Sequence, residues 1–590
     1  MNKTSAKEGM PPASLDPLLQ QALSHHQAGR LAEAVGLYCQ VLDACPDHID
    51  ALNFGGAAFF QSGENDQALE MLRKAVKLAP DYAEVHNNLG KVLHESGSPG
   101  ESLLCFERAL ELKPDFLEAE NNLGLALQDL GRPGEAVETY RSILSHKPDI
   151  PEILVNLSRA LLGMKEYDEA EATIKRTIKI WPHAVAYDNL AVIHMATGRY
   201  DLAAEACRQA IEKDPSYAEA HNNLGVCLTR MSQDKEAAQA HRRALELAPH
   251  DIKLRYNYAQ GHIFSTDDPE LEVLEKLLQH EGLPDYQRGL LLFALGKAHD
   301  EVGNYNEAFS FYERGNALVA EGVTFDRERH HDLIASIKKA FAKRAVSDIA
   351  GKTEQDSVPV FVVGLSRSGK SLVGSLLSQH DLVHGIEESA QWVFSLEEIL
   401  RKFEIFEELP DAVCLLDKAQ KKKVAEVFME KISVTGSHGR YIVNTAPANY
   451  LYVGMILESL PQAKIIHCRW DAVDTALSIF FSRYERGHAY SYDMGDIASY
   501  MADYLDLMAY WENGYGDRVL SLHYEDLTES TQRACDRIYR FCGLKGGELL
   551  PKDLLTKEHT GRWEKYEPHF GPMLEAFRDH GLIAENSQDS

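Results

Sequence analysis

The sequence DYAEVHNNLGKVLHESGSPGESLLCFERALELKP, residues 81–114, is one period of a pattern that runs through the first half of the chain. The period ends at a proline, and five of the six intervals between such prolines are 34 residues while one is 33. A fixed spacing of this length indicates one structural unit stacked repeatedly on copies of itself. The prolines that mark the pattern are Pro46, Pro80, Pro114, Pro148, Pro182, Pro215 and Pro249.

Each period has the composition of two antiparallel helices. A glycine step such as Ser62-Gly63 separates the helices, and the proline follows the second helix because it cannot continue one. A period of 34 residues with a helix pair is typical of tetratricopeptide (TPR) repeats, so we expect a helical solenoid over residues 15–320 after a flexible N-terminus, 1–14. Small residues recur where the paired helices must approach closely: Gly55, Gly90, Gly124 and Gly225.

One asparagine recurs in the first helix of nearly every repeat. In TPR proteins this position faces the groove of the solenoid, and an amide offers both a donor and an acceptor to the backbone of an extended peptide. The column therefore predicts a peptide-binding groove; the alternative is that asparagine is simply common at this repeat position. Its members are Asn88, Asn122, Asn156, Asn189, Asn223 and Asn257.

The net charge, the apolar runs and the cysteine spacing of the chain disfavour several classes of protein and partner. The 590 residues carry a formal net charge of -29, which disfavours duplex DNA and anionic membrane as partners. No apolar run is long enough to span a membrane, and the N-terminus lacks the apolar core of a signal peptide. Nine cysteines without Cys-x-x-Cys spacing, and no His-Glu-x-x-His, predict reduced thiols in the cytoplasm and no dedicated zinc site.

A second domain follows the repeats. Residues 321–357 read as a helical connector and a polar linker, and after them short β-rich runs alternate with helical patterns. Such alternation predicts an α/β domain with a parallel sheet over residues 358–590. The predicted strands are Val358–Val363, Tyr441–Asn444, Ala463–Cys468 and Val519–His523.

The first of these strands runs into a loop suited to phosphate. Gly364-Leu-Ser-Arg-Ser-Gly-Lys-Ser371 satisfies the Walker A pattern, in which backbone N–H groups at a helix start cradle a phosphate and Lys370 adds a positive charge. A nucleotide kinase would also need an acidic magnesium ligand after a hydrophobic strand. Asp471 is a weak candidate for that ligand, so the kinase interpretation stays an alternative.

The loop also resembles another family. The stretch VPVFVVGLSRSGKSLVGSLLSQHDLVHGIEES, residues 358–389, resembles the phosphosulfate-binding segment of sulfotransferases, with Arg367, Ser368 and Gly369 matching its core. Residues 463–511, VLSLHYEDL at 519–527 and GRWEKY at 561–566 resemble later segments of that family in the same order. Together with the repeats, the chain is similar to bacterial TPR-containing sulfotransferases, which are related to protein-tyrosine sulfotransferases.

This resemblance implies a donor and a set of roles. The donor would be 3′-phosphoadenosine 5′-phosphosulfate (PAPS), with Ser478 at its 3′-phosphate and no metal required. Glu388 would be the general base, with Glu387 a near-equal candidate, and Arg367 and Lys370 would stabilise the leaving group. The loop residues that would hold the 5′-phosphosulfate are Arg367, Ser368, Gly369, Lys370 and Ser371.

The chain departs from the family pattern in three places. Trp470 stands where the family has an arginine for the 3′-phosphate, and Arg469 lies one residue earlier, which on a strand turns its side chain to the other face. Thr445 stands where many members have a catalytic lysine. The segment between residues 550 and 561 is shorter than usual, with Lys557 and Arg562 as possible phosphate contacts.

The sequence therefore predicts a cytoplasmic enzyme that moves a sulfuryl group from PAPS to a hydroxyl, with a protein tyrosine among the candidate acceptors. The solenoid would bind the protein or peptide acceptor, and no nucleic acid is expected as a partner. Two alternatives remain open: a non-catalytic TPR scaffold with a decayed sulfotransferase domain, and the Walker-type nucleotide kinase.

Overall fold

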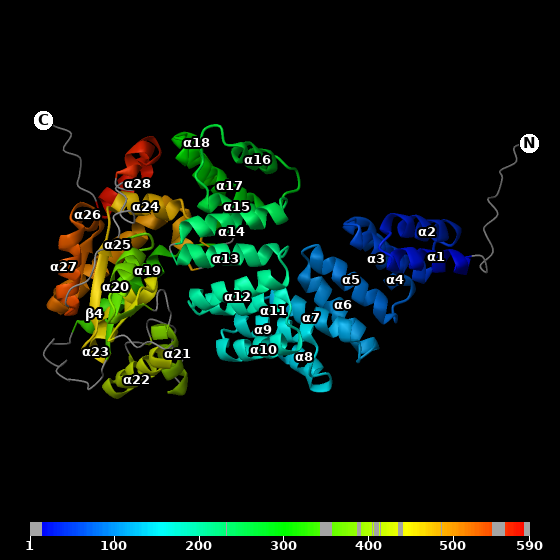
Figure 1. Ribbon diagram of the computed structural model, residues 1–590, viewed down its shortest axis with the longest axis horizontal. Coiled ribbons are helices and arrows are strands. Elements are labelled where there is room, and N and C mark those ends of the chain that lie inside the picture. The colour runs from blue at the N-terminus through cyan, green and yellow to red at the C-terminus, as the bar shows by residue number, and fades with distance from the viewer. Residues whose placement is uncertain are drawn as a thin grey trace, which may run out of the picture. The chain divides into compact units, whose positions relative to one another are not determined.

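The computed structural model describes residues 15–231, 233–321, 323–342, 357–385, 391–403, 405, 412, 415–434, 440–484, 487–544 and 561–582. Its packing divides the chain into two compact units, Met1–Met231 and Ser232–Ser590 (Figure 1). The domain boundaries proposed above follow sequence pattern and not packing, and they stay a prediction.

The first unit is built from helical hairpins. Its helices alternate between 13 and 14 residues, and each packs on the next along the chain. They are α1 (Leu15–Gln27), α2 (Leu31–Ala44), α3 (Ile49–Gln61), α4 (Asn65–Leu78), α5 (Ala83–Glu95), α6 (Pro99–Leu112), α7 (Leu117–Asp129), α8 (Pro133–His146), α9 (Pro151–Gly163), α10 (Tyr167–Ile180), α11 (Ala184–Ala196), α12 (Tyr200–Lys213) and α13 (Ala218–Arg230).

Glycine allows the two helices of a hairpin to touch. A Cβ at Gly90 on α5 would lie 2.6 Å from the ring of Phe106 on α6, and Phe106 is 1% exposed. Gly124 stands in the same relation to Tyr140 one repeat later. The turn at Gly63 has a φ of 82°, which a residue with a side chain adopts only with strain. The predicted helix pairs are confirmed, as are the close contacts at Gly55, Gly90 and Gly124.

The second unit begins with six more helices. The α17–α18 hairpin lies at the end of the predicted solenoid, and α19 lies within the predicted connector. The helices α15 and α16 are only ten residues each, shorter than the helices of the first unit. The bounds are α14 (Asp234–Leu247), α15 (Ile252–Gly261), α16 (Pro269–Leu278), α17 (Asp285–Glu301), α18 (Tyr305–Ala320) and α19 (Arg327–Phe341).

A five-stranded sheet with the order β2-β3-β1-β4-β5 forms the centre of the rest of this unit, and all its pairings are parallel. Three strands match the predicted ranges, and β4 is shifted by one residue. The sequence analysis missed β2, whose three residues are too short to give a periodic signal. The strands are β1 (Val358–Val363), β2 (Val383–Gly385), β3 (Tyr441–Asn444), β4 (Lys464–Arg469) and β5 (Val519–His523).

Helices cover both faces of the sheet, because successive side chains of a strand point to opposite sides. Val360 and Val362 join a core with α20 (Lys370–Ser378) and α27 (Thr531–Cys542). Phe361 and Val363 join the larger core that includes α25 (Met494–Tyr515). The other elements are α21 (Gln391–Lys402), α22 (Lys418–Val434), η4 (Pro447–Tyr452), α23 (Val453–Ser459), α24 (Ala472–Phe480), η5 (Ala489–Tyr492), η6 (Gly516–Arg518), α26 (Tyr524–Glu529), η9 (Arg562–His569) and α28 (Gly571–Asp579).

Among the described residues, no helix is both long and apolar enough to cross a membrane.

Candidate active site

The phosphate-type loop joins β1 to α20 at the carboxyl edge of the sheet. Gly364 follows β1 at a point where the chain passes close to β4: a Cβ there would lie 2.9 Å from the carbonyl oxygen of Cys468. Gly369 caps α20 with a φ of 86°. The loop therefore needs glycine at both ends, and it directs the free N–H groups of the first turn of α20 outward.

Lys370 is the first residue of α20, and only 4% of it is exposed. Its ammonium group donates a hydrogen bond of 2.8 Å to the carbonyl oxygen of Leu365 and so closes the loop on itself. Burial raises the pKa of the neighbouring Cys468 thiol to about 12, an effect that the charge of Lys370 opposes. A positive charge is thus held at the base of the loop.

Arg367 stands at the exposed crest of the loop. Its φ of 68° is left-handed, which is uncommon for a residue with a long side chain and costs energy. Its Nε donates to the hydroxyl of Ser478 at 3.1 Å, although the two residues are 111 positions apart in the chain. The strained backbone thus holds a cation against the helix that follows β4.

Two serines lie in the loop, and a third lies in the first turn of α20. The Ser366 hydroxyl accepts a hydrogen bond of 2.8 Å from Tyr484. The Ser368 hydroxyl is buried and has no hydrogen-bond partner among the described residues. Ser371, in the first turn of α20, is exposed. The unpartnered Ser368 hydroxyl is a group that a phosphate in the loop would satisfy.

Ser478 is held in place by the fold of α24. The helix begins at Asp471, whose carboxylate accepts from the N–H groups of Val473 and Asp474 at 2.9 Å each. Asp474 is 2% exposed and accepts from the N–H groups of Gly561 and Trp563 at 2.6 and 3.0 Å. Burial raises the pKa of the Asp474 carboxyl, and these two amides oppose that rise.

Arg469, the last residue of β4, and Trp470, which follows it, have different neighbours. Arg469 is on the same side of the strand as His467, which bonds Glu512 of α25. Trp470 lies next to Tyr524, with ring centroids 5.3 Å apart, and the Tyr524 ring lies against Gly369. Trp470 therefore lies beside Tyr524, the ring that touches the loop, whereas the side chain of Arg469 leaves the strand on the α25 face.

Arg562, a predicted phosphate contact, has its partners on α17 and at the end of α24. Its guanidinium forms an ion pair with Asp300 of α17 and lies over the ring of Phe481, 5.4 Å from the centroid. Tyr566 donates to the same carboxylate at 2.5 Å. We call Asp300, Arg562 and Tyr566 the Asp300 cluster; it joins the last helical hairpin to the tail that Asp474 also holds.

Thr445, at the place of the expected lysine, is 4% exposed and lies against α20: a Cβ at Gly374 would be 2.9 Å from its methyl carbon. Glu387, Glu388 and Lys557 lie outside the described residues. The structure thus brings together Arg367, Ser368, Gly369, Lys370 and Ser478, while Arg469 and Arg562 are directed to other partners.

No group of three or more histidine, cysteine, aspartate or glutamate side chains within the described ranges is arranged to hold a metal ion. The groups that the loop offers, namely backbone amides, two cations and hydroxyls, are of the kind that bind anions in proteins.

Residues 359–547 match the model of the sulfotransferase family. Tetratricopeptide repeat models match residues 83–116, 127–190 and 189–252, and a further TPR model matches 56–97. The chain joins TPR repeats to a sulfotransferase-family domain. The sequence-based prediction of this combination is confirmed.

One curated relative is similar to more than half of the chain. An uncharacterized protein of Aquifex aeolicus (strain VF5) is 24% identical over 402 residues, which is 64% of this chain and 52% of that protein. The chain therefore spans about half the length of the relative that it matches.

Solved structures resemble the repeats. A tetratricopeptide repeat protein from Parabacteroides merdae ATCC 43184 has a TM-score of 0.39 and 17% identity, covering 42% of this chain and 99% of that one. A thermophilic TPR protein of Thermus thermophilus has a TM-score of 0.29 and 24% identity, covering 30% of this chain and 98% of that one.

The asparagine column of the TPR solenoid has partners that the sequence analysis did not foresee. Four of the six side chains donate an N–H to a side-chain oxygen 35 residues earlier, in the preceding repeat: Asn88 to Asn53, Asn122 to Asn87, Asn156 to Asn121 and Asn223 to Asp188, at 2.8–3.0 Å. Asn189 differs and donates to the Val185 carbonyl oxygen of its own helix at 2.8 Å. We call this series the amide ladder. It bonds successive repeats to one another, and peptide binding by the same residues stays a prediction.

The amide ladder should stabilise the solenoid. Asn156→Ala removes a buried bond between repeats and leaves the Asn121 oxygen without its donor, so the unfolding free energy of this region should fall by about 1–3 kcal/mol. Asn189→Ala removes only a bond within its helix and serves as the matched control. Hydrogen exchange of the α7 and α9 amides measures the difference; equal exchange in the two variants would contradict a stabilising ladder.

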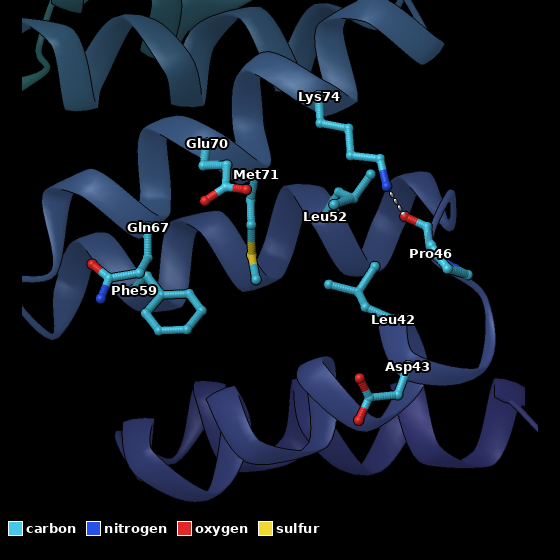
Figure 2. Close-up of a pocket in the computed structure, with 9 residues that line it drawn as sticks. All are labelled: Leu42, Asp43, Pro46, Leu52, Phe59, Gln67, Glu70, Met71 and Lys74. Atoms are coloured by element: carbon cyan, nitrogen blue, oxygen red, sulfur yellow. Dashed lines mark hydrogen bonds between the residues drawn. The ribbon is translucent and has the colours of Figure 1, made fainter.

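A cleft of about 260 Å³ lies in the first repeats, between α2, α3 and α4. Figure 2 shows an apolar floor with polar side chains at the rim, where Lys74 donates to the carbonyl oxygen of Pro46 at 2.6 Å. No residue predicted from sequence to be functional lines it. Its lining is Leu42, Asp43, Pro46, Leu52, Phe59, Gln67, Glu70, Met71 and Lys74.

Proposed function

We propose that this chain is a PAPS-dependent sulfotransferase that transfers a sulfuryl group to a hydroxyl acceptor. The observation that carries the proposal is the 3.1 Å bond between Arg367 and Ser478. These residues belong to the two segments that resemble the phosphate-binding segments of sulfotransferases, and the fold brings them together at the carboxyl edge of a parallel sheet, where ligands of such folds bind.

The transfer needs charge stabilisation and a base. The bond between sulfur and the bridging oxygen of PAPS breaks, the bond between sulfur and the acceptor oxygen forms, and 3′-phosphoadenosine 5′-phosphate (PAP) leaves with the electron pair. Lys370, Arg367 and the loop amides would stabilise the charge that grows on the bridging oxygen. The acceptor proton would pass to Glu388. No step requires a metal.

The TPR solenoid would present the acceptor. Solenoid concavities are common binding surfaces for extended chains, so a protein or peptide hydroxyl, with tyrosine among the candidates, is the proposed acceptor. A triple variant of Asn122, Asn156 and Asn189 to Ala should then lose activity on a protein acceptor and keep it on a small phenol. The cytoplasm is the proposed location.

The kinase alternative is less well supported. Asp471, its candidate magnesium ligand, uses its carboxylate to cap α24 through two backbone amides. Calorimetry with PAP, and separately with ATP and magnesium, tests the two functions directly. Binding of ATP with magnesium together with no binding of PAP would refute the sulfotransferase proposal.

Lys370→Ala should weaken binding of PAP by about 1.5–3 kcal/mol, the range for a hydrogen bond to a charged group. Two effects contribute. The variant loses a positive charge at the base of the loop, and it loses the hydrogen bond from Lys370 to the Leu365 carbonyl oxygen that closes the loop. Titration calorimetry with PAP measures the loss. Lys276→Ala, on exposed α16, is the control and should bind PAP like the wild type.

A further inference from the structure

We propose that Tyr484 is a positioning residue of the phosphate loop. By holding Ser366, it keeps the next residue, Arg367, in the conformation from which Arg367 bonds Ser478. The inference rests on the proposed function, because it concerns the loop that would hold the donor. It gives a role to a tyrosine that no sequence motif marked as functional.

A hydrogen bond joins Tyr484 to the loop. The tyrosine lies four residues beyond α24, and its hydroxyl donates to that of Ser366 at 2.8 Å, although the two residues are 118 positions apart in the chain. Ser366 directly precedes Arg367, whose Nε donates to Ser478 of α24 at 3.1 Å. The loop is therefore tied twice to the segment made of α24 and the residues that follow it.

The loop needs such support at Arg367. Its φ of 68° lies in the left-handed region, where a residue with a side chain stays only if its surroundings hold it. Arg367 is itself exposed, so its neighbours in sequence must supply the constraint. On one side, Ser368 is 3% exposed and its N–H donates to the Leu365 carbonyl oxygen at 3.3 Å. On the other side, the constraint is the bond between Ser366 and Tyr484.

Tyr484 is held in turn by contacts on both sides of it in the chain. Its ring stacks on the His488 ring, with centroids 4.1 Å apart and an angle of 17° between the planes. Its carbonyl oxygen accepts a hydrogen bond of 3.3 Å from the hydroxyl of Tyr492. Arg483, the preceding residue, lies over the ring of Tyr286 on α17, 5.0 Å from the centroid. The Tyr484 hydroxyl therefore has a defined place, which a residue that orients a binding loop requires.

The hydroxyl group of Tyr484 is the part of the side chain on which the inference depends. A phenylalanine would keep the stacking on His488 and would lack the group that reaches the loop. A direct contact with the acceptor is the competing role for this hydroxyl. That role would change the KM for the acceptor and leave the affinity for the donor unchanged, so the two roles differ in which ligand they affect.

Calorimetry with PAP and with inorganic pyrophosphate tests the proposal. Tyr484→Phe should raise the dissociation constants for both ligands about 2- to 12-fold, the effect of losing one neutral hydrogen bond, because both place phosphate in the loop. Ser366→Ala should give the same loss, and the double variant should lose no more than either single one, since all three lack the same bond. Ser366→Thr keeps a hydroxyl for Tyr484 and should bind PAP like the wild type. Tyr510→Phe is the matched control, because its hydroxyl bonds the Lys338 carbonyl oxygen on α19.

Three results would overturn the inference and leave the proposed function in place. They are unchanged PAP affinity in Tyr484→Phe, losses that add up in the double variant, and a raised KM for para-nitrophenol without a change in PAP affinity. Failure of the wild type to bind PAP would instead refute the proposed function, and the inference with it.

Thermal melting identifies a variant with a damaged fold. If Tyr484→Phe melts well below Tyr510→Phe, Ser366→Ala decides the question, because it leaves the tyrosine in place. Wild-type PAP affinity in Ser366→Ala would then overturn the inference.

Discussion

Changing Glu388 to Gln should leave the affinity for PAP unchanged and lower turnover about 10²–10⁴-fold, the usual effect of removing a general base. Glutamine has nearly the same shape as glutamate, but it cannot take the proton of the acceptor hydroxyl. Glu388 lies outside the described residues, yet it follows β2, whose carboxyl end is at the same edge of the parallel sheet as the phosphate loop. That edge is where a base for this reaction is needed.

Glu387→Gln is the matched control, since it changes the neighbouring carboxylate in the same way. The pH profile adds a second readout: the wild-type rate should rise with pH as the base loses its proton, and this rise should vanish in the Glu388 variant. Full turnover in Glu388→Gln, with a large loss in Glu387→Gln, would transfer the role of base to Glu387.

Asp300→Ala should lower the unfolding free energy of the second unit by about 3–5 kcal/mol, the cost of removing one partner from a buried ion pair. The side chains of Asp300 and Arg562 are 13% and 24% exposed, and Tyr566 is completely buried. The variant leaves the Arg562 cation and the Tyr566 hydroxyl without their common acceptor. It also loosens the joint between the α17–α18 hairpin and the tail held by Asp474.

Urea unfolding followed by tryptophan fluorescence measures this effect. Four of the five tryptophans lie in the second unit, so the signal reports mainly on that unit. Glu272→Ala is the control, because its pair with Lys276 is about 70% exposed on both sides and should contribute less than about 1 kcal/mol. A loss in Asp300→Ala as small as in the control would mean that the Asp300 cluster does not stabilise this joint.

Contacts from α18 fix the end of α24, the helix that carries Ser478. Asn316 of α18 donates to the carbonyl oxygen of Phe480 at 2.8 Å, and Tyr312 stacks on Phe481 with centroids 3.9 Å apart. The last repeat-like hairpin therefore holds the end of the helix that carries Ser478. All of these elements belong to the second compact unit.

The general architecture could be predicted from sequence because it depends on local and periodic signals. Proline spacing and glycine steps specify the helix pairs, and β-rich runs specify β1, β3, β4 and β5 within one residue. The phosphate loop is equally local, since Gly364, Gly369 and the first residue of the following helix, Lys370, lie close together in sequence. These features need no knowledge of distant partners.

The partners of individual side chains were decided only by the tertiary structure. The amide ladder depends on how one repeat stacks on the next, and so the same asparagines that predict a peptide groove also bond the repeats together. Arg562, expected at a phosphate, is paired with Asp300, 262 residues away in sequence. Side chains alternate along a strand, so Arg469 lies on the α25 face, whereas Trp470, one residue later, lies beside Tyr524. The physical reason is common to all three: a charge or an amide bonds to the group that the fold brings within about 3 Å, and sequence spacing does not carry that distance.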